Sequence, residues 1–101
     1  FQKVNSCNLS SYHLFVIKID SKIKKFNRNK LYLKLKSQGI NANVHYIPIY
    51  RHAYYQKLGF EKNHYKTCEN YFKNCLTLPI FPTLKNKDIN KIIKNVRSFF
   101  I

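Results

Sequence analysis

The N-terminal half of the chain passes from a polar stretch to an alternating pattern and then to a helical one. Residues 1–10 are polar and show no period, so we expect a linker or the end of a preceding element. Tyr12–Asp20 is rich in β-branched and aromatic residues that alternate, which predicts a strand. From about Asn27, a residue type that caps helices, leucines recur at helical spacing. Gly39 stands where a glycine would end that helix.

The centre of the chain predicts a second strand followed by short helices. Ile40–Ile47 alternates, and Pro48 is expected to stop its pairing because proline lacks a backbone donor. His52–Leu58 is predicted to form a short helix that Gly59 closes. A further helix is predicted from about Tyr65 to Asn74, with its aromatic residues facing inward.

The C-terminal third predicts one short strand and the clearest amphipathic helix of the chain. Leu76–Ile80 contains a proline, which favours an edge or a bulge. Asn86–Phe99 carries an apolar stripe that is expected to pack on the core. The members of this stripe are Ile89, Ile92, Ile93, Val96, Phe99 and Phe100. The predicted order is β-α-β-α-α-β-α, an α/β fold with a small mixed or antiparallel sheet and flanking helices.

The composition indicates a single folded domain. A chain of 101 residues with 45% hydrophobic and 16% aromatic residues can bury a modest core. No apolar run is long enough to span a bilayer, and no secretory leader pattern occurs. The three cysteines form no CxxC pair, which favours reduced thiols and a cytoplasmic location. Because the chain begins with Phe1 and contains no methionine, we infer a fragment or a processed product of a longer protein.

The formal charge of +15 raises nucleic-acid binding as an alternative function. A stand-alone basic α/β module that binds RNA would use aromatic strands and a cationic surface. However, Lys, Asn, Ile, Phe and Tyr supply 55 of the 101 residues, and all five have codons rich in A and T. Arg, which makes bidentate phosphate contacts, occurs only three times. Base composition of the gene therefore explains the charge better than a nucleic-acid partner does.

The sequence offers no catalytic, cofactor-binding or metal-binding motif. Its four acidic residues are scattered, and none of the glycine-rich phosphate loops or nucleophile motifs occurs. His45 and His52 are seven residues apart across a proline, and Cys68 and Cys75 have the same separation; neither spacing matches a zinc site. We therefore predict no catalytic and no metal-binding residue in this chain.

The segment from Gly39 to Tyr55 is the best candidate for a binding site. It combines two histidines, four tyrosines and an arginine around a proline, more ring and imidazole chemistry than a turn requires. Imidazole, phenol and guanidinium groups can together hold a polar, anionic ligand. The predicted substrate-binding residues are His45, Tyr46, Tyr50, Arg51 and, with less support, His52. A purely structural role for His45 and Tyr46, as hydrogen-bonded sheet residues, stays open.

Five short segments together resemble a known family. In chain order they are Tyr12–Phe15, Gln38–Ile40, His45–Tyr50, Tyr54–Phe60 and Leu76–Pro82. Their order and spacing resemble the C-terminal small domain of the DegT/DnrJ/EryC1/StrS sugar-nucleotide aminotransferases, over about residues 10 to 97. The resemblance is strongest to the branch that aminates a 4-keto hexose on a UDP-linked sugar in pathways of the pseudaminic acid type.

The resemblance implies the small domain of a fold type I enzyme that uses pyridoxal phosphate. Residues 11–101 would form this domain, and the large domain with the cofactor lysine would lie outside the chain. The intact enzyme would move an amino group, from glutamate, to a keto sugar nucleotide for surface glycans, as a homodimer. No cofactor is expected for the chain alone, which should be inactive.

The family pattern also marks the binding segment, with two departures. His45–Tyr50 matches the stretch that in the family comes near the cofactor and the nucleotide sugar. Many relatives have histidine at the position of Tyr50 and proline at the position of Ala53. The first departure weakens a one-for-one role for Tyr50, and the second is expected to loosen the loop.

Overall fold

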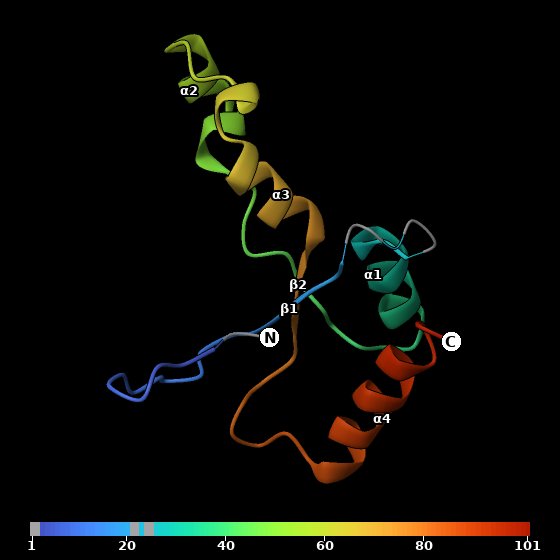
Figure 1. Cartoon of the computed structure of the whole chain (residues 1–101). Helices are drawn as coiled ribbons and strands as arrows, with labels where there is room; N and C mark the ends of the chain where they lie inside the picture. The colour runs from blue at the N-terminus through green and yellow to red at the C-terminus, as the bar shows by residue number, and fades with distance from the viewer. Residues whose placement is uncertain (1–2, 21–22, 24–25) are drawn as a thin grey trace.

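The computed structural model describes residues 3–20, 23 and 26–101. Two strands and four α-helices follow one another with two 3₁₀ turns between them (Figure 1). The elements are β1 (Phe15–Lys18), α1 (Arg28–Ser37), η1 (Ile49–Arg51), α2 (Ala53–Lys57), η2 (Lys62–His64), α3 (Lys66–Asn74), β2 (Cys75–Leu78) and α4 (Asn86–Arg97). The predicted α/β class with a small antiparallel sheet and flanking helices is confirmed.

Strand β2 is paired along one side and bridged at one residue on the other. It pairs with β1 in antiparallel register, with Phe15 opposite Leu78 and Lys18 opposite Cys75. On its other side, Thr77 and Asn43 exchange main-chain hydrogen bonds of 2.9 and 2.8 Å. The proline on which the predicted edge or bulge rested lies outside the strand, because the strand ends at Leu78.

The strand predicted over Ile40–Ile47 is not formed; only Asn43 makes a bridge. The reason lies in two local hydrogen bonds that compete with ladder pairing. The Ala42 amide donates to the Ile40 carbonyl oxygen at 3.0 Å, and the Val44 amide donates to the Asn43 side-chain oxygen at 2.8 Å. Asparagine side chains commonly divert the backbone in this way.

Both glycines end helices as predicted. Gly39 has a φ of +69°, and the Ile40 amide donates back to the Leu35 carbonyl oxygen at 2.9 Å. Gly59 has a φ of +86° and closes α2 through the same arrangement. These are Schellman motifs, in which a left-handed residue lets the following amides satisfy the last helical carbonyls. At the other end of α1, the Asn27 side-chain oxygen accepts from the Lys30 amide at 2.9 Å, which confirms Asn27 as the cap.

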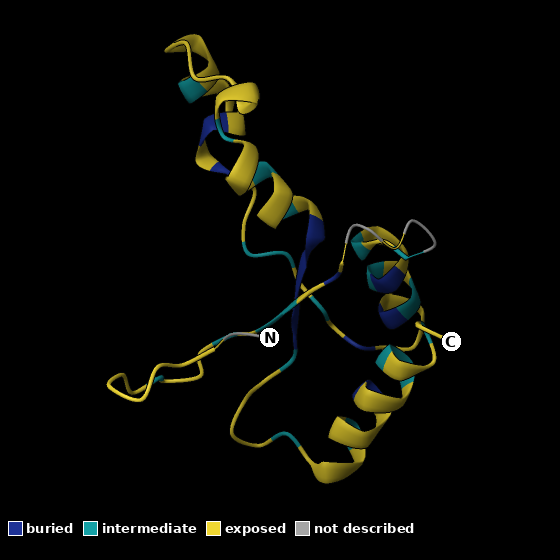
Figure 2. Cartoon of the chain, in the orientation of Figure 1, coloured by how far each residue is buried: buried dark blue, intermediate teal, exposed yellow. Residues whose placement is uncertain are grey.

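The core lies where α1 and α4 pack beside the sheet (Figure 2). Its fully buried side chains are Leu31, Leu35 and Leu76. The stripe of α4 reaches the core only in part. Ile92 is buried, whereas Ile89 and Ile93 are 37% and 42% exposed, so the prediction that the whole stripe is core contact is wrong.

The exposed side of that stripe forms an apolar groove. Its walls are Phe15, Leu78, Pro79, Ile80, Leu84, Ile89, Ile92 and Ile93, around a volume of about 310 Å³. The groove lies between the end of the sheet and α4. It stays open because a two-stranded sheet is too small to cover the whole apolar face of this helix.

An arm made of η1, α2, η2 and α3 projects away from α1 and α4 (Figure 1). Its base has no connecting loop, since Asn74 ends α3 and Cys75 begins β2. The Cα radius of gyration is 15.8 Å, against about 13 Å for a compact domain of 100 residues. The chain is thus an elongated molecule with a small core at one end. Among the described residues, no helix has the length and apolar character needed to cross a membrane.

Candidate functional site

The predicted site residues fall into two groups rather than one cluster. His45 and Tyr46 lie beside β2, while Tyr50 and Arg51 lie against α3 in the arm. His52 is exposed at the start of α2 and makes no side-chain cap. Sequence spacing could not separate these groups, because it gives no information on which neighbour each side chain meets.

The imidazole of His45 is held between two polar side chains. Its Nδ1 lies 2.9 Å from the Thr77 hydroxyl, and its Nε2 lies 3.5 Å from the side-chain nitrogen of Asn43. Tyr46 follows across a cis peptide bond, and its ring meets the imidazole edge-on with centroids 4.7 Å apart. The Tyr46 ring is 74% exposed. His45 is thus tied to the sheet, whereas Tyr46 is free to contact a ligand.

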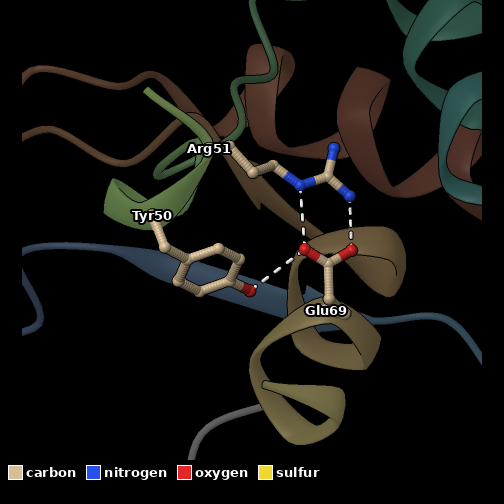
Figure 3. Close-up of polar contacts among 3 residues, drawn as sticks. All are labelled: Tyr50, Arg51 and Glu69. Atoms are coloured by element: carbon tan, nitrogen blue, oxygen red, sulfur yellow. Dashed lines mark hydrogen bonds and ion pairs between the residues drawn. The ribbon is translucent and has the colours of Figure 1, made fainter. Parts of the chain in front are cut away.

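Tyr50 and Arg51 converge on one carboxylate, that of Glu69 in α3 (Figure 3). The Tyr50 hydroxyl donates to Oε1 of Glu69 at 3.0 Å, and the Arg51 Nε donates to the same oxygen at 2.8 Å. The second carboxylate oxygen forms an ion pair with a terminal guanidinium nitrogen of Arg51. The Arg51 guanidinium therefore binds the Glu69 carboxylate in a bidentate, charge-assisted arrangement.

These contacts shift the pKa values of all three groups. Burial, and then the contacts with Cys68 and Glu69, raise the pKa of Tyr50, so the phenol stays protonated and donates. The hydrogen bond from Arg51 lowers the pKa of Glu69, although partial burial works against it. The same hydrogen bond raises the pKa of Arg51. At neutral pH the group therefore contains an ionised pair and a neutral phenol.

Aromatic rings hold this polar group in place. Tyr50 stacks on Tyr65 with centroids 4.4 Å apart and an interplanar angle of 19°. The Arg51 guanidinium lies 4.9 Å from the centre of the Phe72 ring, and Arg28 of α1 lies 5.3 Å from the same ring. The contact with Arg28 links the arm to α1, and the contact with Arg51 lies within the arm; both are cation–π contacts.

Sequence analysis missed Glu69, the residue on which this group depends. It was one of the four acids regarded as scattered, although it lies in a predicted helix close to an aromatic segment. Because Glu69 neutralises Arg51, the arginine is not the free positive charge that the sequence suggested. Figure 3 shows the remaining guanidinium nitrogen pointing away from the carboxylate, where it can still donate.

A pocket of about 550 Å³ opens beside this group. Tyr50, Arg51 and Lys62 line it, together with Gln56, Phe60, Glu61 and Asn63. Its walls combine two cationic side chains with two aromatic rings, a chemistry that suits an anionic ligand with a ring. Within the part of the chain that the structure describes, no cluster of three histidine, cysteine or acidic side chains could hold a metal ion.

The fold is that of a segment of sugar aminotransferases. It superposes on the putative sugar aminotransferase Spr1654 from Streptococcus pneumoniae, in its PLP form, with a TM-score of 0.79 and 30% identity over 89% of this chain. It also superposes on Helicobacter pylori PseC, an aminotransferase involved in the biosynthesis of pseudoaminic acid, with a TM-score of 0.76 and 28% identity over 87% of this chain. The superposed part is 23% of each of those structures.

The sequence agrees with the structural likeness. Residues 2–97 match the model of the DegT/DnrJ/EryC1/StrS aminotransferase family. The spore coat polysaccharide biosynthesis protein SpsC of Bacillus subtilis is 34% identical over 89 residues, which is 86% of this chain and 23% of the relative. The chain therefore belongs to the DegT/DnrJ/EryC1/StrS aminotransferase family, and it spans about a quarter of the length of these relatives.

The RNA-binding alternative receives no support from these comparisons. The sheet also lacks what such a module needs, since β1 and β2 together carry one aromatic residue, Phe15. Base stacking on a sheet surface uses two or three aromatic side chains.

Proposed function

We propose that residues 11–101 are the C-terminal small domain of a pyridoxal-phosphate aminotransferase that moves an amino group, from glutamate, to a keto sugar nucleotide for surface glycans. The observation that carries this proposal is the family match over residues 2–97, supported by the fold shared with sugar aminotransferases. The elongated shape and the exposed apolar groove fit a domain that packs against a larger one. The intact enzyme is proposed to be a homodimer.

Pyridoxal phosphate, when bound, supplies the electron sink for amino-group transfer. In this proposal the described residues do not hold it by themselves. Every described lysine except Lys34 is exposed, and the Lys34 ammonium is engaged with the Ser98 hydroxyl at 2.8 Å. In this proposal the cofactor and its lysine belong to the large domain.

The role proposed for this chain is to bind and orient the nucleotide sugar. Tyr46 offers an exposed ring and hydroxyl, and His45 lies beside it. Arg51 and Lys62 line the pocket in the arm, where their donors can meet diphosphate oxygens. His52, exposed directly after Arg51 in the sequence, is the least constrained of the proposed ligands.

The test is to compare the 101-residue chain with the full-length protein encoded around it. Both are incubated with pyridoxal phosphate, reduced with borohydride and digested, and modified lysines are counted by mass spectrometry. The full-length protein should carry one stoichiometric adduct outside these 101 residues and should transfer an amino group from glutamate to a keto sugar nucleotide. A single stoichiometric adduct on the isolated chain would contradict the proposal, and so would a reading frame without a large upstream domain.

A further inference from the structure

The hydrogen bonds around His45 determine which of its ring nitrogens carries the proton. The main-chain amide of Val44 can only donate. The Asn43 side-chain atom 2.8 Å from this amide must therefore be the oxygen, and the other amide atom must be the NH₂ group. The orientation of Asn43 is thus fixed by its neighbour and not by the histidine.

The NH₂ group of Asn43 is the atom that faces Nε2 of His45, at 3.5 Å. Because an NH₂ group can only donate, a hydrogen on Nε2 would put two donors against each other. Nε2 therefore carries a lone pair, and the proton of the neutral ring lies on Nδ1. That proton is donated to the Thr77 hydroxyl oxygen, 2.9 Å away, on strand β2, which is held by its pairing with β1.

We infer that Asn43 and Thr77 are positioning residues that hold His45 as a hydrogen-bond acceptor, so that its Nε2 recognises a sugar hydroxyl and not a phosphate oxygen. The 3.5 Å separation from Asn43 is long for a hydrogen bond, so the Nε2 lone pair is only weakly satisfied. A hydroxyl group can donate to this lone pair at a better distance. The oxygens of an ionised diphosphate carry no hydrogen and cannot. The inference rests on the proposed function for the identity of the ligand, but not for the state of the ring.

This arrangement divides the proposed binding work between the two groups of residues. The donors in the arm, Arg51 and Lys62, suit the diphosphate, and the acceptor beside the sheet suits the sugar. In this inference the proton on Nδ1 leaves Nε2 without a hydrogen that it could donate to a phosphate oxygen.

The state of the ring is tested first, on the 101-residue chain. Nitrogen-15 NMR of the side chain at pH 7.5 should find hydrogen on Nδ1 and none on Nε2. In Asn43→Asp, a carboxylate oxygen can face the ring in place of the NH₂ group, so Nε2 should gain a hydrogen. The bridge to Thr77 uses only main-chain atoms of Asn43, so the variant should still fold. Asn41→Asp adds the same charge at an exposed position two residues away and should leave the ring unchanged. A hydrogen on Nε2 in the wild-type chain would overturn the inference.

The ligand is tested in the full-length protein by calorimetry with two probes, UDP and the same nucleotide carrying a hexose. His45→Ala should weaken binding of the nucleotide sugar about three- to ten-fold, the range of one hydrogen bond, and leave UDP unchanged. An equal loss for both probes would overturn the sugar assignment. If the wild-type protein binds neither probe, the proposed function fails with the sugar assignment, while the NMR result on the ring still stands.

Discussion

At the scale of single residues, the two groups of site residues differ in what they can do. His45 is bound to the sheet through Thr77, whereas Arg51 is charged but already engaged by Glu69. A charged pair of this kind is sensitive to the removal of either partner, because the remaining charge then lacks its counterpart. Substitution of Glu69 therefore tests how much this ion pair contributes to the stability of the arm.

We predict that Glu69→Gln flattens the dependence of stability on acid pH. The groups that face Glu69 are Arg51, Tyr50 and Lys62, and hydrogen bonding from Arg51 holds its pKa below the usual value. A lowered folded-state pKa gives stability that is present above the unfolded carboxyl pKa of about 4.3 and is lost as the pH falls through the folded value. Urea unfolding of both proteins between pH 7 and pH 3 measures the difference.

The matched control for this experiment is Glu61→Gln, which removes an exposed carboxylate from the same arm. The wild-type chain and the control should lose stability below about pH 5 more steeply than Glu69→Gln does. Parallel curves for all three proteins would show that the ion pair contributes nothing to the fold.

At the scale of elements, helix ends are where the local sequence acts most directly. Gly39 closes α1 in the left-handed region, and an added Cβ there would meet no atom within 4 Å. Any cost of substitution at this position is thus a cost of backbone conformation and not of crowding.

Gly39→Ala should destabilise the chain by about 1–2 kcal/mol, the cost of a left-handed conformation for a residue with a Cβ. Gly39→Asn should cost less, because asparagine tolerates this region better than alanine does. Chemical denaturation monitored by circular dichroism provides the measurement. A loss from alanine no larger than that from asparagine would mean that the helix end has moved to another residue.

Helix ends marked by a characteristic residue type could be predicted from the sequence, and features that depend on which partner a side chain contacts could not. Asn27, Gly39 and Gly59 mark helix ends through their own side chains or backbone, and all three predictions are confirmed. The prediction of a strand over Ile40–Ile47 is wrong, because an alternating pattern does not show that the Asn43 side-chain oxygen accepts a hydrogen bond from the Val44 amide. Glu69 was missed for a similar reason, since its partner lies eighteen residues away along the chain.

At the scale of the whole molecule, the apolar groove along α4 leaves several hydrophobic side chains partly exposed to solvent. Ile80, Ile89 and Ile93 are between 37% and 42% exposed in a wall with little polar character. A continuous surface of this kind attracts apolar ligands or other chains.

The isolated chain is therefore predicted to bind an apolar fluorescent dye such as ANS in its folded state, through this groove. The double substitution Ile89→Lys and Ile93→Lys should remove most of the signal at a cost of about 1–3 kcal/mol in stability, because both side chains are more than half buried, so dye binding is measured under conditions where the variant is still folded. Leu33→Lys is the control, since Leu33 is 63% exposed on α1, away from the groove. Dye binding that survives the double substitution would place the apolar surface elsewhere.

Because α3 continues directly into β2, the distance between the two groups of site residues is limited. Glu69, which fixes the arm group, and Thr77, which fixes His45, belong to one uninterrupted run of helix and strand. The rise per residue in the two conformations limits the separation of their Cα atoms to about 17 Å. The helix and strand therefore fix the spacing of the two groups of site residues. Inserting one residue into the helical part would turn Glu69 by about 100° relative to the sheet. In the proposed function, a ligand that contacts both groups of site residues must span the distance that this run sets. The protein then selects the length of its ligand in addition to its chemistry.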